Sequence, residues 1–180
     1  KQRLRSLAAA LLFLSAAALL VWALPVFHLS ELEVNELRTV SREEIISLSG
    51  LTQGQHLLAG LGGSAGHWFS LRYAEAERRL QDAVPTIKSV TVRMDFPGKI
   101  QVEIEERVEV AYIRIPDGCV MIDKEGVALS ILPAPPGDIP VIEGVTVASM
   151  TLGQPLTVDV PSALHSAMSL MGAIIDADQD

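Results

Sequence analysis

A serine inside a glycine-rich stretch is the first candidate for chemistry. Ser64 lies in Gly62-Gly63-Ser64-Ala65-Gly66, which matches the G-x-S-x-G motif of hydrolase nucleophiles, and Asp159 and His165 follow in the chain order that such enzymes use. The motif requires a buried strand directly before the serine, but residues 55–61 contain no β-branched side chain. We therefore predict a glycine loop, and an anchored serine hydrolase remains the less favoured alternative.

Metal and cofactor chemistry has equally little support in the sequence. The four histidines have no ligand spacing, and the single cysteine, Cys119, can form neither an internal disulfide nor a cysteine-type metal site. Residues 60–65 satisfy G-x-G-x-x-A, but a dinucleotide site also needs a strand-helix-strand unit. We expect no catalytic residue, no metal, no cofactor and no small-molecule substrate.

The charge balance excludes another class of partner. The 180 residues carry a formal net charge of −8, and the three basic residues Lys1, Arg3 and Arg5 all stand ahead of the first acidic residue. Because nucleic-acid binding needs a basic surface, we expect no nucleic-acid partner. A hydrophobic content of 49% is too high for a disordered chain and indicates a folded core.

An uncharged stretch over residues 7–27 predicts a membrane-spanning helix. At 1.5 Å per residue it is about 31 Å long, close to the roughly 30 Å hydrocarbon core of a bilayer. The basic residues before it predict that residues 1–6 are cytoplasmic and that the rest of the chain lies outside the cytoplasm, on the plasma membrane. A cleaved secretory signal is the alternative, although its apolar region is usually shorter.

The part beyond residue 27 predicts an α+β fold. Residues 28–37 alternate as a strand, and a capping box from Ser41 to Glu44 starts a short helix that Gly50 ends. A second helix is predicted over 70–84 with Glu77 on its outer side, and a hairpin follows over 89–105. This order of strand, two helices and two strands can bury one face of a small sheet.

The remaining residues predict a second, β-rich unit. Short strands over 110–115, 119–123 and 127–132 are separated by glycine turns, and a helix is expected around 162–175. A meander that stops there leaves an open sheet edge, so we expect this unit to be incomplete at its C-terminal end. Because the first residue is Lys, the chain is also expected to be a fragment at its beginning.

Several strings resemble the FtsQ/DivIB family of bacterial cell-division proteins. The strongest is PTIKSVTVRMDFPGKIQVEIEERVEVA at residues 85–111, with its proline and isoleucine before a strand, its Phe-Pro turn and its Glu-Arg before Val-Ala. SREEIISLSGLTQGQHLL at 41–58, MIDKEGVAL at 121–129 and IPVIEG at 139–144 are also similar. Glu109 stands in a region where many relatives have proline.

The resemblance implies a POTRA domain over 28–107, followed by a β domain over 108–180 that lacks its final strands. It also implies a membrane scaffold of the divisome at the division septum, without catalysis. Its implied partners are FtsB/DivIC, FtsL and the proteins of septal peptidoglycan synthesis. An exported POTRA module for outer-membrane protein handling is the alternative within the same fold class.

A partner-binding edge is the remaining site hypothesis. A three-stranded sheet under two helices leaves an edge whose free backbone groups can recruit a partner's strand. The topology implied by the resemblance places the strand over 88–94 at that edge. We predict that Lys88, Thr91 and Arg93 border a partner site, with an ordinary protected edge as the alternative.

Overall fold

The computed structural model describes residues 2–137 and 139–177 and divides the chain into two compact units. The first unit contains Lys1–Leu80 and Val90–Ile104, and the second contains Gln81–Ser89 and Glu105–Asp180. Both units combine helices with sheets, which confirms the predicted α+β class.

The first helix, α1 (Gln2–Ala23), is followed by a short 3-10 turn, η1 (Pro25–Phe27). The helix ends before the predicted limit of residue 27 because Pro25 has no N–H to continue the ladder of hydrogen bonds. Across the described residues, no helix is both long and apolar enough to pass through a membrane. The membrane span over 7–27 therefore stays a prediction.

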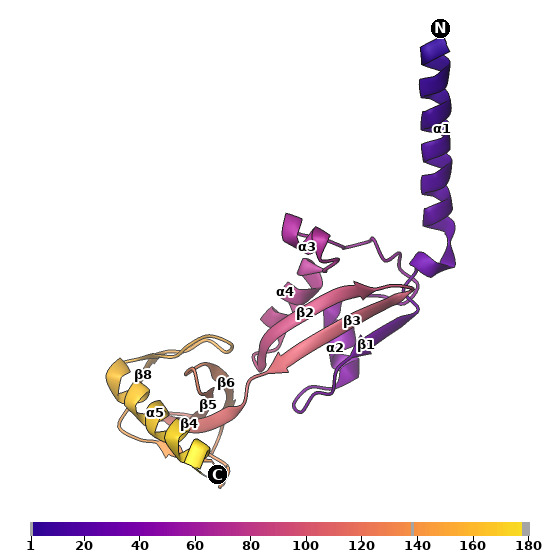
Figure 1. Cartoon of the computed structure of the whole chain (residues 1–180). Coiled ribbons are helices and arrows are strands. Elements are labelled where there is room, and N and C mark those ends of the chain that lie inside the picture. The colour runs from indigo at the N-terminus through magenta and orange to yellow at the C-terminus, as the bar shows by residue number, and fades with distance from the viewer. Residues whose placement is uncertain (1, 138, 178–180) are drawn as a thin grey trace. The chain divides into compact units, whose positions relative to one another are not determined.

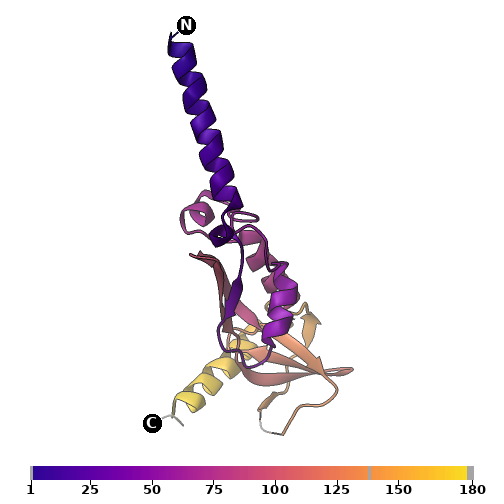
Figure 2. The same cartoon turned by 90° about the vertical axis from the view of Figure 1, so that its right-hand side faces the viewer.

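A three-stranded sheet forms the centre of the first unit (Figure 1). Its strands are β1 (Glu31–Val34), β2 (Ile87–Asp95) and β3 (Lys99–Glu106), in the order β1-β3-β2, with β1 parallel to β3. The helices α2 (Arg42–Ser49) and α4 (Ala74–Ala83) cover one face of this sheet, which Figure 2 shows from the side. The alternation of β2 and β3 places Val92, Ile100 and Val102 in the core, where all three are fully buried.

Helix α2 begins and ends where the sequence predicts. The Ser41 hydroxyl accepts a hydrogen bond from the Glu44 N–H at 3.2 Å, and Gly50 ends the helix with a φ of 71°. This positive φ is what favours glycine there, because a β-carbon at Gly50 would meet only the flexible end of the Arg79 side chain, which can move away. The capping and stop signals are both confirmed.

The second predicted helix is wrong in its start and in the position of Glu77, whereas its end before Pro85 is confirmed and Leu80 is fully buried. Residues 70–73 lie outside α4, and a further short helix, α3 (Ala65–Phe69), precedes them. Glu77, predicted to face solvent, is only 8% exposed, because the buried stripe runs through Tyr73, Ala76, Glu77 and Leu80 at helical spacing.

The second unit contains a four-stranded sheet with the order β6-β5-β4-β7. Its strands are β4 (Glu109–Ile115), β5 (Gly118–Asp123), β6 (Ala128–Leu132) and β7 (Val141–Ile142), followed by the small pair β8 (Val147–Ser149) and β9 (Thr157–Val158). The first three confirm the predicted meander, and α5 (Pro161–Ala177) confirms the predicted helix. Leu164 of α5 joins the core of this sheet.

Candidate partner-binding site

The three predicted site residues all lie on β2, an edge strand of its sheet. Thr91 and Arg93 are two residues apart and share a face, and Arg93 donates hydrogen bonds to Gln101 at 2.9 Å and Glu103 at 3.4 Å. The hydrogen bond to Glu105, 2.8 Å away, raises the pKa of Lys88 above its ordinary value. Both cations are therefore already paired within the chain.

The edge of β2 is not open along its whole length. The Val92 carbonyl accepts a hydrogen bond from the Tyr73 N–H at 2.9 Å, and the Met94 N–H donates to the Leu71 carbonyl at 2.8 Å. The Glu77 carboxylate accepts from the Val92 N–H at 2.9 Å. The segment 71–73 thus covers residues 92–94 in the way that a partner strand would, which leaves residues 88–90 as the remaining part of this edge.

A buried carboxylate fastens that covering segment. Glu77 Oε1 accepts a hydrogen bond from Arg72 Nε at 2.8 Å and Glu77 Oε2 accepts one from Arg72 Nη2 at 2.9 Å. His67 Nε2 lies 3.3 Å from the same Oε2. The two parallel bonds from one guanidinium make this a strong, directional ion pair. Sequence reasoning missed this cluster, because Arg72 and Glu77 are five residues apart and lie outside the spacings of three and four that pair side chains along one helix.

The Ser64 hydroxyl lies 2.6 Å from His67 Nδ1 and accepts a hydrogen bond from the His67 N–H at the start of α3. The His67 ring thus lies between the Ser64 hydroxyl and the Glu77 carboxylate, but that carboxylate is held by Arg72 and the Val92 N–H. The residues before Ser64 form a loop rather than a strand, so the predicted glycine loop is confirmed. This geometry gives Ser64 a capping role.

The two residues paired with Ser64 in the sequence motif belong to the second unit. The Asp159 carboxylate accepts hydrogen bonds from the backbone N–H groups of Thr146 at 3.0 Å and Val160 at 2.9 Å, directly before α5. The bond from Thr146 lowers the pKa of Asp159. Asp159 therefore organises the entry to α5, and His165 lies on that helix.

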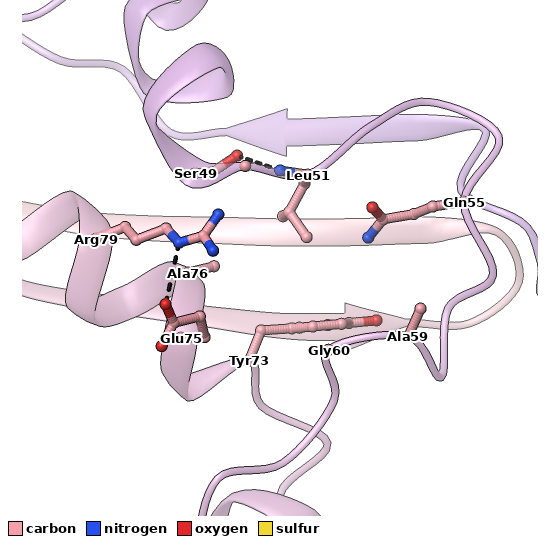
Figure 3. Close-up of a pocket in the computed structure, with 10 residues that line it drawn as sticks. Ser49, Leu51, Gln55, Ala59, Gly60, Tyr73, Glu75, Ala76 and Arg79 are labelled. Atoms are coloured by element: carbon pink, nitrogen blue, oxygen red, sulfur yellow. Dashed lines mark hydrogen bonds and ion pairs between the residues drawn. The ribbon is translucent and has the colours of Figure 1, made fainter.

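A pocket of about 220 Å³ lies in the first unit where the end of α2, the start of α4 and the loop 51–60 meet (Figure 3). The side chains of Gln55, Tyr73 and Arg79 surround it. The Tyr73 hydroxyl donates to the Leu57 carbonyl at 2.5 Å, and Arg79 Nε donates to Glu75 at 3.1 Å. A guanidinium and a carboxamide, both able to form hydrogen bonds, are therefore among the groups that line the pocket.

A second buried ion pair organises the β-rich unit. Arg107 Nη1 lies 2.5 Å from Asp123 and 2.7 Å from Glu125, and Asp123 is only 2% exposed. The other Asp123 oxygen accepts from the backbone N–H groups of Glu125 and Val127. This carboxylate closes the turn between β5 and β6.

The fold defines the class of the first unit. A sheet of order β1-β3-β2 with two helices on one face is the arrangement expected of a POTRA domain, and residues 27–107 match the family model described as "POTRA domain, FtsQ-type". The chain belongs to the FtsQ/DivIB family of cell-division proteins.

Similarity to individual relatives extends beyond the POTRA domain. The chain is 28% identical over 120 residues to cell division protein FtsQ of Corynebacterium glutamicum, which covers 67% of this chain and 49% of that protein. It is 30% identical over 142 residues to FtsQ of Myxococcus fulvus, covering 77% and 45%, and 28% identical over 131 residues to cell division protein DivIB of Bacillus cytotoxicus, covering 73% and 46%. The matched part thus spans about half the length of these relatives.

Proposed function

We propose that this chain is a non-catalytic scaffold of the divisome that binds FtsB/DivIC and FtsL and helps to regulate septal peptidoglycan synthesis. The observation that carries the proposal is the FtsQ-type POTRA match over residues 27–107, together with relatives that are named cell division proteins. A role in cell division follows from the family, and the particular partners are our proposal. Paired carboxylates and hydroxyls with structural tasks agree with a binding role.

In this proposal α1 anchors the scaffold in the plasma membrane, with residues 1–6 cytoplasmic and 7–27 in the bilayer. What supports this anchor is the uncharged sequence over residues 7–27, which as a continuous helix would be about 31 Å long, close to a bilayer core of roughly 30 Å. The described leucine and phenylalanine side chains of α1 are all more than half exposed. A POTRA domain over 28–107 and a β domain over 108–180 would then act outside the cytoplasm, at the septum.

The proposed partner surface is the part of β2 around Lys88, Thr91 and Arg93. The covered backbone at 92–94 restricts strand addition to residues 88–90, so Thr91 and Arg93 would border the partner through their side chains. The charged ends of Lys88 and Arg93 are held in place by ion pairs with acidic neighbours. This favours a partner whose charges and backbone amides are complementary to a fixed arrangement of groups.

Co-purification from dividing cells tests both levels of the proposal. The tagged chain should retain FtsB/DivIC and FtsL and should gather at midcell. The double variant Lys88→Gln and Arg93→Gln should lower the retained amount roughly fivefold, corresponding to about 1 kcal/mol of binding. The control Arg78→Gln removes an equally paired cation from the exposed side of α4 and should change nothing.

The outcomes of these experiments distinguish the scaffold proposal from the proposal that β2 is the partner surface. If the chain retains neither partner and is dispersed around the cell, the scaffold proposal is wrong. If the double variant keeps full recruitment while its circular dichroism spectrum is unchanged, the β2 surface is not the binding site. A uniform loss in the control as well would likewise reject the β2 surface as a specific site.

A further inference from the structure

Helix α3 and the residues directly after it expose large apolar side chains to solvent. Phe69 is 92% exposed and Trp68 is 54% exposed, and Leu71 is also exposed. We call Trp68, Phe69 and Leu71 the α3 tip. Three neighbouring large apolar residues without cover are uncommon on a soluble surface and mark a place where something else binds.

The exposure of the α3 tip is built into the backbone. Ser64 caps α3, and the Arg72 N–H donates to the His67 carbonyl at 2.8 Å across the tip. Gly62 has a φ of 103°, and a β-carbon at this position would clash with the Trp68 indole ring. Glycine at position 62 therefore allows the indole ring to pack against the backbone. Leu71 has a φ of 54°, a strained value that only the surrounding bonds can maintain.

The tip lies at the end of its unit from which α1 departs (Figures 1 and 2). Contacts fasten the loop that leads into α3 to this end of α1. The Leu57 N–H donates to the Phe27 carbonyl at 2.6 Å, and the His56 ring stacks on Trp22 with 4.3 Å between centroids. Any bilayer that holds α1 would therefore have its surface close to the tip.

The sequence around the tip has an unusual charge pattern. Residues 45–74 contain no Asp or Glu, although the chain has 22 acidic residues. The same stretch contains Arg72, His56 and His67. This stretch therefore brings no carboxylate of its own toward the anionic headgroups of a bacterial membrane, although the exposed Asp95 directly follows Met94, whose N–H donates to the Leu71 carbonyl.

We propose that the α3 tip inserts into the headgroup region of the bilayer that holds α1, so that the POTRA unit is attached to the membrane at two places. Tryptophan and phenylalanine on a short, rigid projection are the side chains that favour this region. Because α1 already holds the unit at the surface, insertion is intramolecular and three apolar side chains suffice. The inference rests on the proposed anchoring of α1.

The two tryptophans of the chain allow the two attachments to be tested separately. The full chain is reconstituted into phosphatidylethanolamine and phosphatidylglycerol vesicles that contain lipids brominated near the headgroup. In Trp22→Phe the only tryptophan is Trp68, and in Trp68→Phe it is Trp22, so excitation that is selective for tryptophan reports on one position at a time. We expect brominated lipid to remove at least half of the emission in both variants, and acrylamide to quench Trp68 weakly.

A further pair of substitutions tests the tip itself. In the Trp22→Phe background, Phe69→Ser should reduce lipid quenching of Trp68 at least twofold, without a cost in folding because Phe69 has almost no contacts to lose. The control Leu170→Ser removes another exposed large apolar side chain, on α5, and should leave the quenching unchanged.

Each other outcome has a definite meaning. Strong lipid quenching of Trp22 with none of Trp68 would overturn the second attachment and leave the anchor intact. Absence of lipid quenching at both positions would reject the anchor and the insertion together. Protection of Trp68 from acrylamide without lipid quenching would mean that protein, including a second copy of this chain, covers the tip, and would also overturn the proposal.

Discussion

Removal of the Glu77 carboxylate should weaken the first unit more than any exposed acidic residue can. Glu77 is 8% exposed and receives two hydrogen bonds from Arg72 and one from the buried Val92 N–H. Glu77→Ala leaves that N–H and the guanidinium without a partner. Loss of one side of a buried ion pair costs about 3–5 kcal/mol, and because Arg72 can regain water we expect about 3 kcal/mol.

Native-state hydrogen exchange measures this effect strand by strand. Amides of β2 that exchange only when the unit opens should lose about two orders of magnitude of protection, since 1.4 kcal/mol corresponds to a factor of ten. Glu77→Gln keeps the volume and one acceptor for the Val92 N–H, so about half of the loss should remain.

Glu75→Gln is the matched control because it alters the same residue type two positions earlier on α4. Glu75 is half exposed and pairs with Arg78 and Arg79 in water, so β2 protection should stay close to that of the unaltered chain. The reasoning would be refuted if Glu77→Ala changed β2 protection by less than tenfold, or if Glu75→Gln matched its effect.

Three further perturbations test other interactions. Arg107→Ala strips the ion partner from Asp123, which is 2% exposed, and should cost about 3 kcal/mol, measured as lost exchange protection in β5. Ser41→Ala removes the cap of α2 and should cost about 1 kcal/mol, measured on the amides of α2. Burial raises the pKa of Tyr73 above its ordinary value of 10.0, so the folded unit holds this proton longer than the unfolded chain. The stability that the protonated Tyr73 hydroxyl contributes to the folded unit is complete below pH 10 and is lost as the pH rises further. Urea unfolding of Tyr73→Phe should therefore show a smaller loss of stability above pH 10 than urea unfolding of the unaltered chain.

Helix α2 and the hairpin of β2 and β3 could be predicted because residues that are close in the sequence determine them. The capping box at Ser41 and the stop at Gly50 fix α2 through bonds between near neighbours. The Phe96-Pro97 turn and the alternation on both sides of it determine the hairpin of β2 and β3. At α2 and at this hairpin, residue pattern and structure agree because the deciding contacts are short-range.

The site was less predictable because its deciding contacts are long-range. A charged residue in a helix is normally placed on the solvent side, and Glu77 was assigned there, but Arg72 and the Val92 N–H compensate its burial. Val92 lies 15 residues along the chain and meets Glu77 only after the sheet has formed. The segment 71–73 covers residues 92–94 because Glu77 holds it there, and no periodic pattern in the sequence indicates this arrangement.

One carboxylate connects the two surfaces proposed for this chain. Through Arg72 and the Val92 N–H, Glu77 holds the segment that covers the β2 edge, and through His67 it reaches α3. A partner strand that replaced the segment 71–73 on β2 would have to break these bonds and would release Leu71 from its strained position in the α3 tip. Recruitment along the whole edge and insertion of the tip into a membrane therefore compete for the same segment. This competition favours a partner confined to residues 88–90 for as long as the tip is inserted.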